Sequence, residues 1–85
     1  MQQFDYIVTQ ESGVHARPAG MLVNVAKKYS SVVKVMTAEK SAEITTMISV
    51  MGLGLKQGDK LTVTVDGADE AEAITALKEF FEKFI

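Results

Sequence analysis

The sequence predicts an α+β fold, in which four short strands and three helices form one domain covering residues 1–85. Three observations support this prediction. Apolar residues alternate with polar ones near the N-terminus, apolar residues recur at helical spacing in two segments, and β-branched residues cluster in two others. A hydrophobic content of 47 % is enough for a single core. The expected order is strand–helix–strand–strand–helix–strand–helix, with helices covering one face of the sheet.

The first strand and the first helix are joined by a turn. Phe4, Tyr6 and Val8 alternate with polar residues, which predicts a strand with one buried face. After a turn at residues 12–13, a helix is expected to run to about residue 29. Its apolar residues have the spacing of one helix face: Ala19, Leu22, Val23, Ala26 and Tyr29.

Two further strands are expected in the middle of the chain. Ser30 and Ser31 end the first helix, and residues 32–37 form a second strand rich in β-branched residues. The chain turns at residues 39–41, so residues 42–44 supply a short third strand.

A short apolar helix follows the third strand. Thr45 and Thr46 can each cap this helix, which runs through Met51 and is ended by the glycines of residues 52–54. This region is rich in apolar residues: Met47, Ile48, Val50, Met51, Leu53 and Leu55. So short a helix cannot bury all of them, and exposed methionines suit a surface that must fit several partners. The alternative is that Met47 and Met51 fill gaps in a thin core.

The last strand and the last helix complete the fold. Residues 57–59 form a turn before residues 61–65, whose pattern predicts the clearest strand of the chain. Asp69 and Glu72 are spaced as a variant of the capping box and begin the last helix. That helix carries a wide apolar stripe: Ala73, Leu77, Phe80, Phe81 and Phe84.

Composition excludes several classes of site. The chain has no cysteine, so disulfides and cysteine–metal sites are excluded, which fits a reducing compartment. The first five residues are polar and lack the features of a signal peptide. No apolar stretch approaches the roughly 20 residues of a membrane span. We therefore expect a cytoplasmic protein that does not insert into membranes.

Charge is distributed unevenly along the chain. The net charge of −2 argues against nucleic acid as a partner. No acid occurs in residues 12–38, which hold four basic residues: Arg17, Lys27, Lys28 and Lys34. From residue 57 onward the acids dominate. These charges either decorate solvated faces or make the histidine's neighbourhood favourable to phosphate.

His15 is the only histidine and lies three residues before the only proline, Pro18, at the entrance to the first helix. Proline is tolerated there because amides in a first helical turn have no intrahelical partner. The imidazole is therefore close in sequence to three groups that favour an anion: the amides of Ala16 and Arg17, the Arg17 guanidinium and the positive end of the helix dipole. The sequence predicts a site that holds an anion beside a nucleophilic nitrogen. The alternative is a helix N-cap, and zinc is disfavoured by the single histidine and absent cysteine.

Residues 13–19, Gly-Val-His-Ala-Arg-Pro-Ala, resemble the phosphorylation site of the HPr family, the histidine phosphocarriers of the bacterial phosphotransferase system. The likeness extends along the chain through its length of 85, His15, Met51 with residues 52–54, and residues 67–70 before the last helix. The resemblance implies an open-faced sandwich, with a four-stranded antiparallel sheet covered on one face by helices.

The resemblance also implies a phosphoryl carrier that is not an enzyme. His15 would accept a phosphoryl group from phosphorylated enzyme I and pass it to the enzyme IIA domains of sugar permeases. Arg17 and the amides of Ala16 and Arg17 would bind the phosphate. No cofactor or metal is expected, and the chain is expected to act as a monomer.

In the family the His15 helix and the short helix together form a docking face. Carried over by position, that face comprises Ala16, Arg17, Gly20, Met21, Asn24, Lys27, Met47, Ile48 and Met51. Gly20 replaces a common threonine and Ser49 replaces a glycine. Thr46 stands where low-GC Gram-positive members carry a serine that a dedicated kinase phosphorylates, and it is therefore the regulatory candidate. A capping role alone would also explain this threonine.

Other functions compete with the carrier. A regulatory adaptor would bind a transcription factor or a metabolic enzyme, with phosphorylation as its switch; related adaptors usually lose the histidine that this chain keeps. A carrier of a nitrogen or dihydroxyacetone branch would differ in its donor and acceptor. A small RNA-binding domain is disfavoured by the acidic balance and by the lack of exposed aromatic residues on strands.

Overall fold

The computed structural model describes residues 1–11 and 16–85. The described residues form seven elements in the expected order: β1 (Gln2–Ile7), α1 (Ala16–Lys27), β2 (Val32–Met36), β3 (Ser41–Glu43), α2 (Met47–Met51), β4 (Lys60–Asp66) and α3 (Glu70–Phe84). The predicted turn at residues 12–13 lies outside the described residues. Each element lies within two residues of its predicted bounds, including α1, which ends at Lys27 where the prediction was about residue 29.

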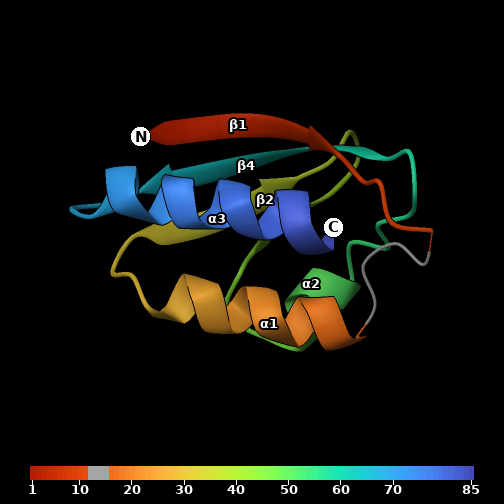
Figure 1. Ribbon diagram of the computed structural model, residues 1–85, viewed down its shortest axis with the longest axis horizontal. Helices are drawn as coiled ribbons and strands as arrows, with labels where there is room; N and C mark the ends of the chain where they lie inside the picture. The colour runs from red at the N-terminus through yellow and green to blue at the C-terminus, as the bar shows by residue number, and fades with distance from the viewer. Residues whose placement is uncertain (12–15) are drawn as a thin grey trace.

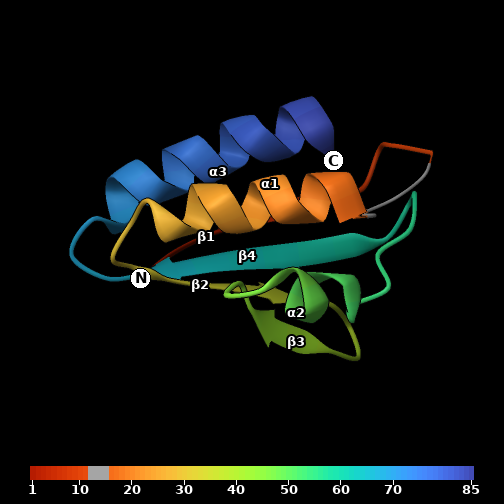
Figure 2. The same cartoon turned by 90° about the horizontal axis from the view of Figure 1, so that it is seen from below.

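The four strands form one antiparallel sheet in the order β1-β4-β2-β3. Val63 of the central strand β4 pairs with Phe4 on one side and Val35 on the other. Helices α1 and α3 lie over one face of this sheet, and no helix of the described chain covers the opposite face (Figures 1 and 2). The α+β open-faced sandwich is thus confirmed.

The core lies between the sheet and the helices. Phe4, Val35 and Val63 point into it, whereas Asp5 and Thr62, their neighbours along the strands, pair on the open face. The predicted helix face of α1 is also buried, through Ala19, Leu22, Val23 and Ala26. This alternation leaves the open face to the other side chains of the strands, which are mostly polar but include the exposed Ile7, Val32 and Met36.

The aromatic residues join α3 to β1. The ring of Phe81 packs edge-on against the rings of Phe4 and Tyr6, with ring centres 5.6 and 5.4 Å apart. The Tyr6 hydroxyl donates a hydrogen bond of 2.8 Å to the Phe81 carbonyl. These contacts hold the C-terminal half of α3 over the edge strand of the sheet.

Two expectations for α3 are wrong. Phe84, which belongs to the predicted apolar stripe, is 39 % exposed at the end of the helix, whereas the next residue, Ile85, is fully buried. The Ile85 carbonyl then accepts hydrogen bonds from the amides of Thr9 and Gln10. The expected capping box is absent as well, since Asp69 precedes the helix but its side chain makes no capping hydrogen bond.

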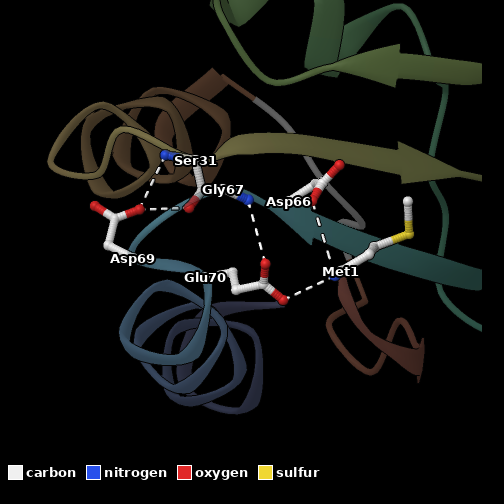
Figure 3. Close-up of polar contacts among 6 residues, drawn as sticks. All are labelled: Met1, Ser31, Asp66, Gly67, Asp69 and Glu70. Carbon is white, nitrogen blue, oxygen red and sulfur yellow. Dashed lines mark hydrogen bonds and ion pairs between the residues drawn. The ribbon is translucent and has the colours of Figure 1, made fainter.

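The Asp69 carboxylate instead binds the segment that follows α1 (Figure 3). It accepts hydrogen bonds from the amides of Ser30 and Ser31, at 2.8 and 3.0 Å, and from the Ser31 hydroxyl. Gly67 permits this approach, because a Cβ atom there would lie 2.6 Å from the Cα of Ser31. The C-terminal end of α1 is therefore attached to the start of α3.

The neighbouring Glu70 joins the same end of the molecule to the N-terminus (Figure 3). Its carboxylate forms an ion pair of 2.9 Å with the α-amino group of Met1 and accepts a hydrogen bond of 3.4 Å from the Gly67 amide. Both interactions lower the pKa of Glu70, the contact with the amino group more strongly. The beginning of β1 is thus connected to the loop between β4 and α3.

Candidate functional site

The predicted acceptor, His15, lies outside the described residues, so the site begins with the first turn of α1. Ala16 and Arg17 open the helix and are exposed, whereas Pro18 is buried. The first turn contains no acidic residue. The first amides of a helix have no partner within it, and they lie at the positive end of its dipole. This end of α1 therefore favours a bound anion.

Arg17 adds a full positive charge to this end of the helix. Within residues 1–11 and 16–85, no carboxylate lies within the 4.0 Å of an ion pair with its guanidinium. A guanidinium presents several donors in a planar fork, which suits the oxygens of a phosphoryl group. The described surroundings thus leave Arg17 available to an external anion.

One face of α1 remains uncovered by the core. The predicted positions on it recur every three or four residues: Arg17, Gly20, Met21, Asn24 and Lys27. Arg17, Asn24 and Lys27 are exposed, while Gly20 and Met21 are partly buried. The opposite face of the helix carries the buried residues. The amphipathic pattern of α1 therefore exposes Arg17, Asn24 and Lys27, whereas Met21 also packs against the core and Gly20 is partly covered.

Helix α2 lies beside the N-terminal half of α1 (Figures 1 and 2). Val50 of α2 is buried, whereas Met47, Ile48 and Met51 are 41 %, 84 % and 44 % exposed. The alternative that both methionines fill gaps in the core is therefore wrong. We call these three residues, together with Ala16 and the five positions of α1, the candidate docking face. Lys27 ends α1 and lies at the far end of this face.

The start of α2 is fixed by a reciprocal pair of hydrogen bonds. The Thr46 hydroxyl oxygen accepts from the Ser49 amide at 3.2 Å, and the Ser49 hydroxyl accepts from the Thr46 amide at 3.4 Å. Of the two threonines that could cap α2, Thr46 therefore does so. The sequence did not predict this role of Ser49, because the usual capping box has Glu or Gln three positions after the cap.

The described chain offers few other kinds of site. Among residues 1–11 and 16–85, no three His, Asp or Glu side chains are grouped so that they could hold a metal ion. None of the described helices has both the length and the apolar character needed to cross a membrane. The chemistry that remains at the candidate docking face is anion binding at the start of α1, next to an exposed apolar patch on α2.

The sequence matches a protein family described as "PTS HPr component phosphorylation site" over residues 2–83. Three solved structures are similar over nearly all of their length. The histidine-containing phosphocarrier protein of Mycoplasma is 34 % identical, with 96 % of this chain and 93 % of that chain covered and a TM-score of 0.93. HPr-C-His of Thermoanaerobacter tengcongensis is 34 % identical, with 98 % and 93 % covered and a TM-score of 0.91.

The third similar structure is Crh of Bacillus subtilis, the catabolite repression containing protein, which is described as a domain-swapped dimer. It is 27 % identical, with 100 % of this chain and 98 % of that chain covered and a TM-score of 0.78. The family match covers the seven elements except the last residue of α3, and these structures share their arrangement. The chain therefore belongs to the HPr phosphocarrier family of the phosphotransferase system.

Proposed function

We propose that this single-domain chain accepts a phosphoryl group on His15 from phosphorylated enzyme I and passes it to enzyme IIA domains of sugar permeases. The observation that carries the proposal is the family's phosphorylation-site match, which includes His15. The helix that follows, α1, carries the exposed Arg17 in its first turn. The carrier is a substrate of other enzymes and needs no cofactor of its own.

The chemistry at His15 follows from its position before a helix. An imidazole with an ordinary pKa of about 6.5 has an unprotonated nitrogen at neutral pH. That nitrogen attacks phosphorus, a nitrogen–phosphorus bond forms, and the bond to the donor breaks with its electron pair remaining on the donor. Transfer to the acceptor breaks the new bond and returns its electrons to the imidazole.

The start of α1 favours acceptance of the phosphoryl group and still allows its release. The helix dipole disfavours a protonated imidazole and favours the phosphorylated product, by about 0.3–1 kcal/mol at an exposed site. Arg17 and the amides of Ala16 and Arg17 would bind the phosphoryl oxygens during transfer. Stabilisation of this size is modest, which suits a carrier that must release its phosphoryl group again.

Partner recognition would use the candidate docking face. Its apolar part on α2 provides Met47, Ile48 and Met51, and methionines adapt to several differently shaped surfaces. Its charged part on α1 provides Arg17 and Lys27 for partners with acidic rims. We propose that the working form is a cytoplasmic monomer, because docking requires this face to be open.

The decisive experiment is incubation with enzyme I and phosphoenolpyruvate, followed by intact-mass measurement. One phosphate should be added, and it should be stable in alkali and lost in mild acid, as a phosphoramidate is. His15→Ala should abolish the addition and leave the thermal melt nearly unchanged. A labelled His15→Ala variant, or a label that survives acid, would contradict the proposal.

A regulatory adaptor is the second candidate, and the similarity to Crh favours it. In that function a transcription factor or a metabolic enzyme would bind the candidate docking face, and a kinase would modify the exposed Thr46. Phosphopeptide mass spectrometry of the protein from its native cell should then detect modified Thr46. If Thr46 stays unmodified in all growth conditions while His15 is phosphorylated, the carrier alone accounts for the protein.

A further inference from the structure

Gly20 of α1 lies directly against Met47 of α2. A Cβ atom built on Gly20 would lie 3.3 Å from the sulfur of Met47 and 3.7 Å from its Cγ. The first distance is shorter than an ordinary contact between such atoms, so any larger residue at position 20 would push the Met47 side chain. Because Gly20 has no side chain, the Met47 side chain lies closer to α1 than it could beside a larger residue.

The backbone of α1 does not require this glycine. The glycines with positive φ in the described chain are Gly54 and Gly58, and Gly20 lies within a regular helix. Glycine in a helix interior is less favourable than alanine, because it loses more conformational freedom on folding. The contact with Met47 provides a compensating reason for glycine at this position.

The backbone of Met47 is fixed by the cap of α2. Met47 is the first residue of α2, directly after the Thr46 cap whose hydrogen bonds with Ser49 fix the start of the helix. Its side chain is 41 % exposed, so one part packs inward while the other faces solvent. Because the backbone of Met47 is anchored, the space at Gly20 determines where its exposed part lies.

We propose that Gly20 is a positioning residue: because it has no side chain, the Met47 thioether packs close to α1, and this contact sets the shape of the face that partners recognise. This inference rests on the proposed function. With Met47 packed against α1 and Arg17 exposed on the same helix, this face suits a partner that carries an apolar group beside an acidic one. A side chain at position 20 would displace Met47 and weaken the binding of that partner.

A double-mutant cycle of Gly20→Thr and Met47→Ala tests this role through kinetics. Gly20→Thr should raise the KM for the carrier in phosphoryl transfer from enzyme I by about three- to tenfold and leave kcat unchanged. In the Met47→Ala background, the same substitution should have almost no effect, because the side chain to be displaced is gone. Independent, multiplicative effects of the two substitutions would overturn the inference. Ala71→Thr, on the exposed side of α3, controls for placing a threonine in a helix.

The methyl resonance of Met47 in protein labelled at its methionine methyl groups provides a readout that needs no partner. Gly20→Thr should shift this resonance and leave that of Met36, on the open face of the sheet, in place. An unmoved Met47 resonance would show that Gly20 does not position it. The smaller Gly20→Ala change, which favours the helix, should shift it less and covers the case in which the threonine variant does not fold.

The transfer kinetics and the Met47 resonance test the proposed function and the role of Gly20 separately. If the wild-type chain accepts no phosphoryl group from enzyme I, the proposed function fails, while the Met47 resonance still decides whether Gly20 positions that side chain. If transfer proceeds and the resonance shifts but KM does not change, the packing contact exists and its role in partner choice is refuted.

Discussion

The Asp69 carboxylate accepts hydrogen bonds from both the amide and the hydroxyl of Ser31, and it thereby joins the end of the α1 region to the start of α3 (Figure 3). The bond from the Ser31 hydroxyl is the main cause that lowers the pKa of Asp69 below its ordinary value, with the Ser30 amide contributing next. The helix that carries the candidate docking face is therefore fixed at its far end by an ionised carboxylate.

The first prediction concerns stability at acid pH. A carboxyl whose pKa is lower in the folded protein stabilises the fold fully above its ordinary pKa, here 3.8. That contribution is lost as the pH falls from 3.8 through the lower pKa of the folded state. The thermal midpoint of the wild type should therefore exceed that of Asp69→Asn by a constant amount near neutral pH, and this advantage should shrink below pH 3.8.

Thermal melts from pH 7 to pH 2, followed by circular dichroism, would measure this difference. Glu82→Gln, at an exposed position of α3, is the matched control and should show no comparable loss of advantage. A difference between wild type and Asp69→Asn that stays the same at every pH would show that the ionised carboxylate is not the stabilising group.

The second prediction concerns Arg17. Arg17→Glu should strongly slow phosphoryl transfer and weaken binding to enzyme I, because it places a negative charge beside the phosphoryl group. The free energy of unfolding should change by no more than about 0.5 kcal/mol, as expected for an exposed residue. Lys34→Glu makes the same charge change on the open face of the sheet and should leave transfer unaltered. Equal kinetics for the two variants would assign Arg17 no role beyond its charge.

The third prediction concerns the apolar part of the candidate docking face. Met51→Glu or Met47→Glu should weaken binding to enzyme I without unfolding the domain, because both side chains are substantially exposed. Met36→Glu, at an exposed methionine on the open face, should leave binding intact. Chemical-shift mapping with enzyme I should show perturbed residues in 15–27 and 46–54 together. Perturbations concentrated on the open face of the sheet would refute this assignment.

The fourth prediction concerns Thr46. Thr46→Asp should fold normally, because an aspartate can also cap a helix. It should nevertheless accept phosphoryl much more slowly, since burying a new charge within an apolar contact is costly. Thr45→Asp places the same charge one residue earlier, outside the cap, and should slow transfer less. Thr46→Ala should lose about 1 kcal/mol of stability with the cap. Unchanged kinetics in Thr46→Asp would show that position 46 does not contact the donor.

The sequence by itself determined the elements and their buried faces. Alternation at Phe4 and Tyr6 identified β1, and the spacing of Ala19, Leu22 and Val23 identified α1 and its inner face. The excess of apolar residues in a very short helix likewise indicated that some must be exposed, as Ile48 is. These properties depend on residues a few positions apart, so they can be seen in the chain before it folds.

Only the tertiary structure decided which distant groups meet. The spacing of Asp69 and Glu72 predicted a local cap, but packing brings Ser31, 38 residues away in the sequence, to the Asp69 carboxylate. In the same way, packing places β4 between β1 and β2, buries Ile85 where Phe84 was expected, and sets Met47 against Gly20. A carboxylate can accept hydrogen bonds from many donors, and a glycine can lie beside many side chains. Which partner Asp69 or Gly20 meets depends on how the helices and the sheet pack together.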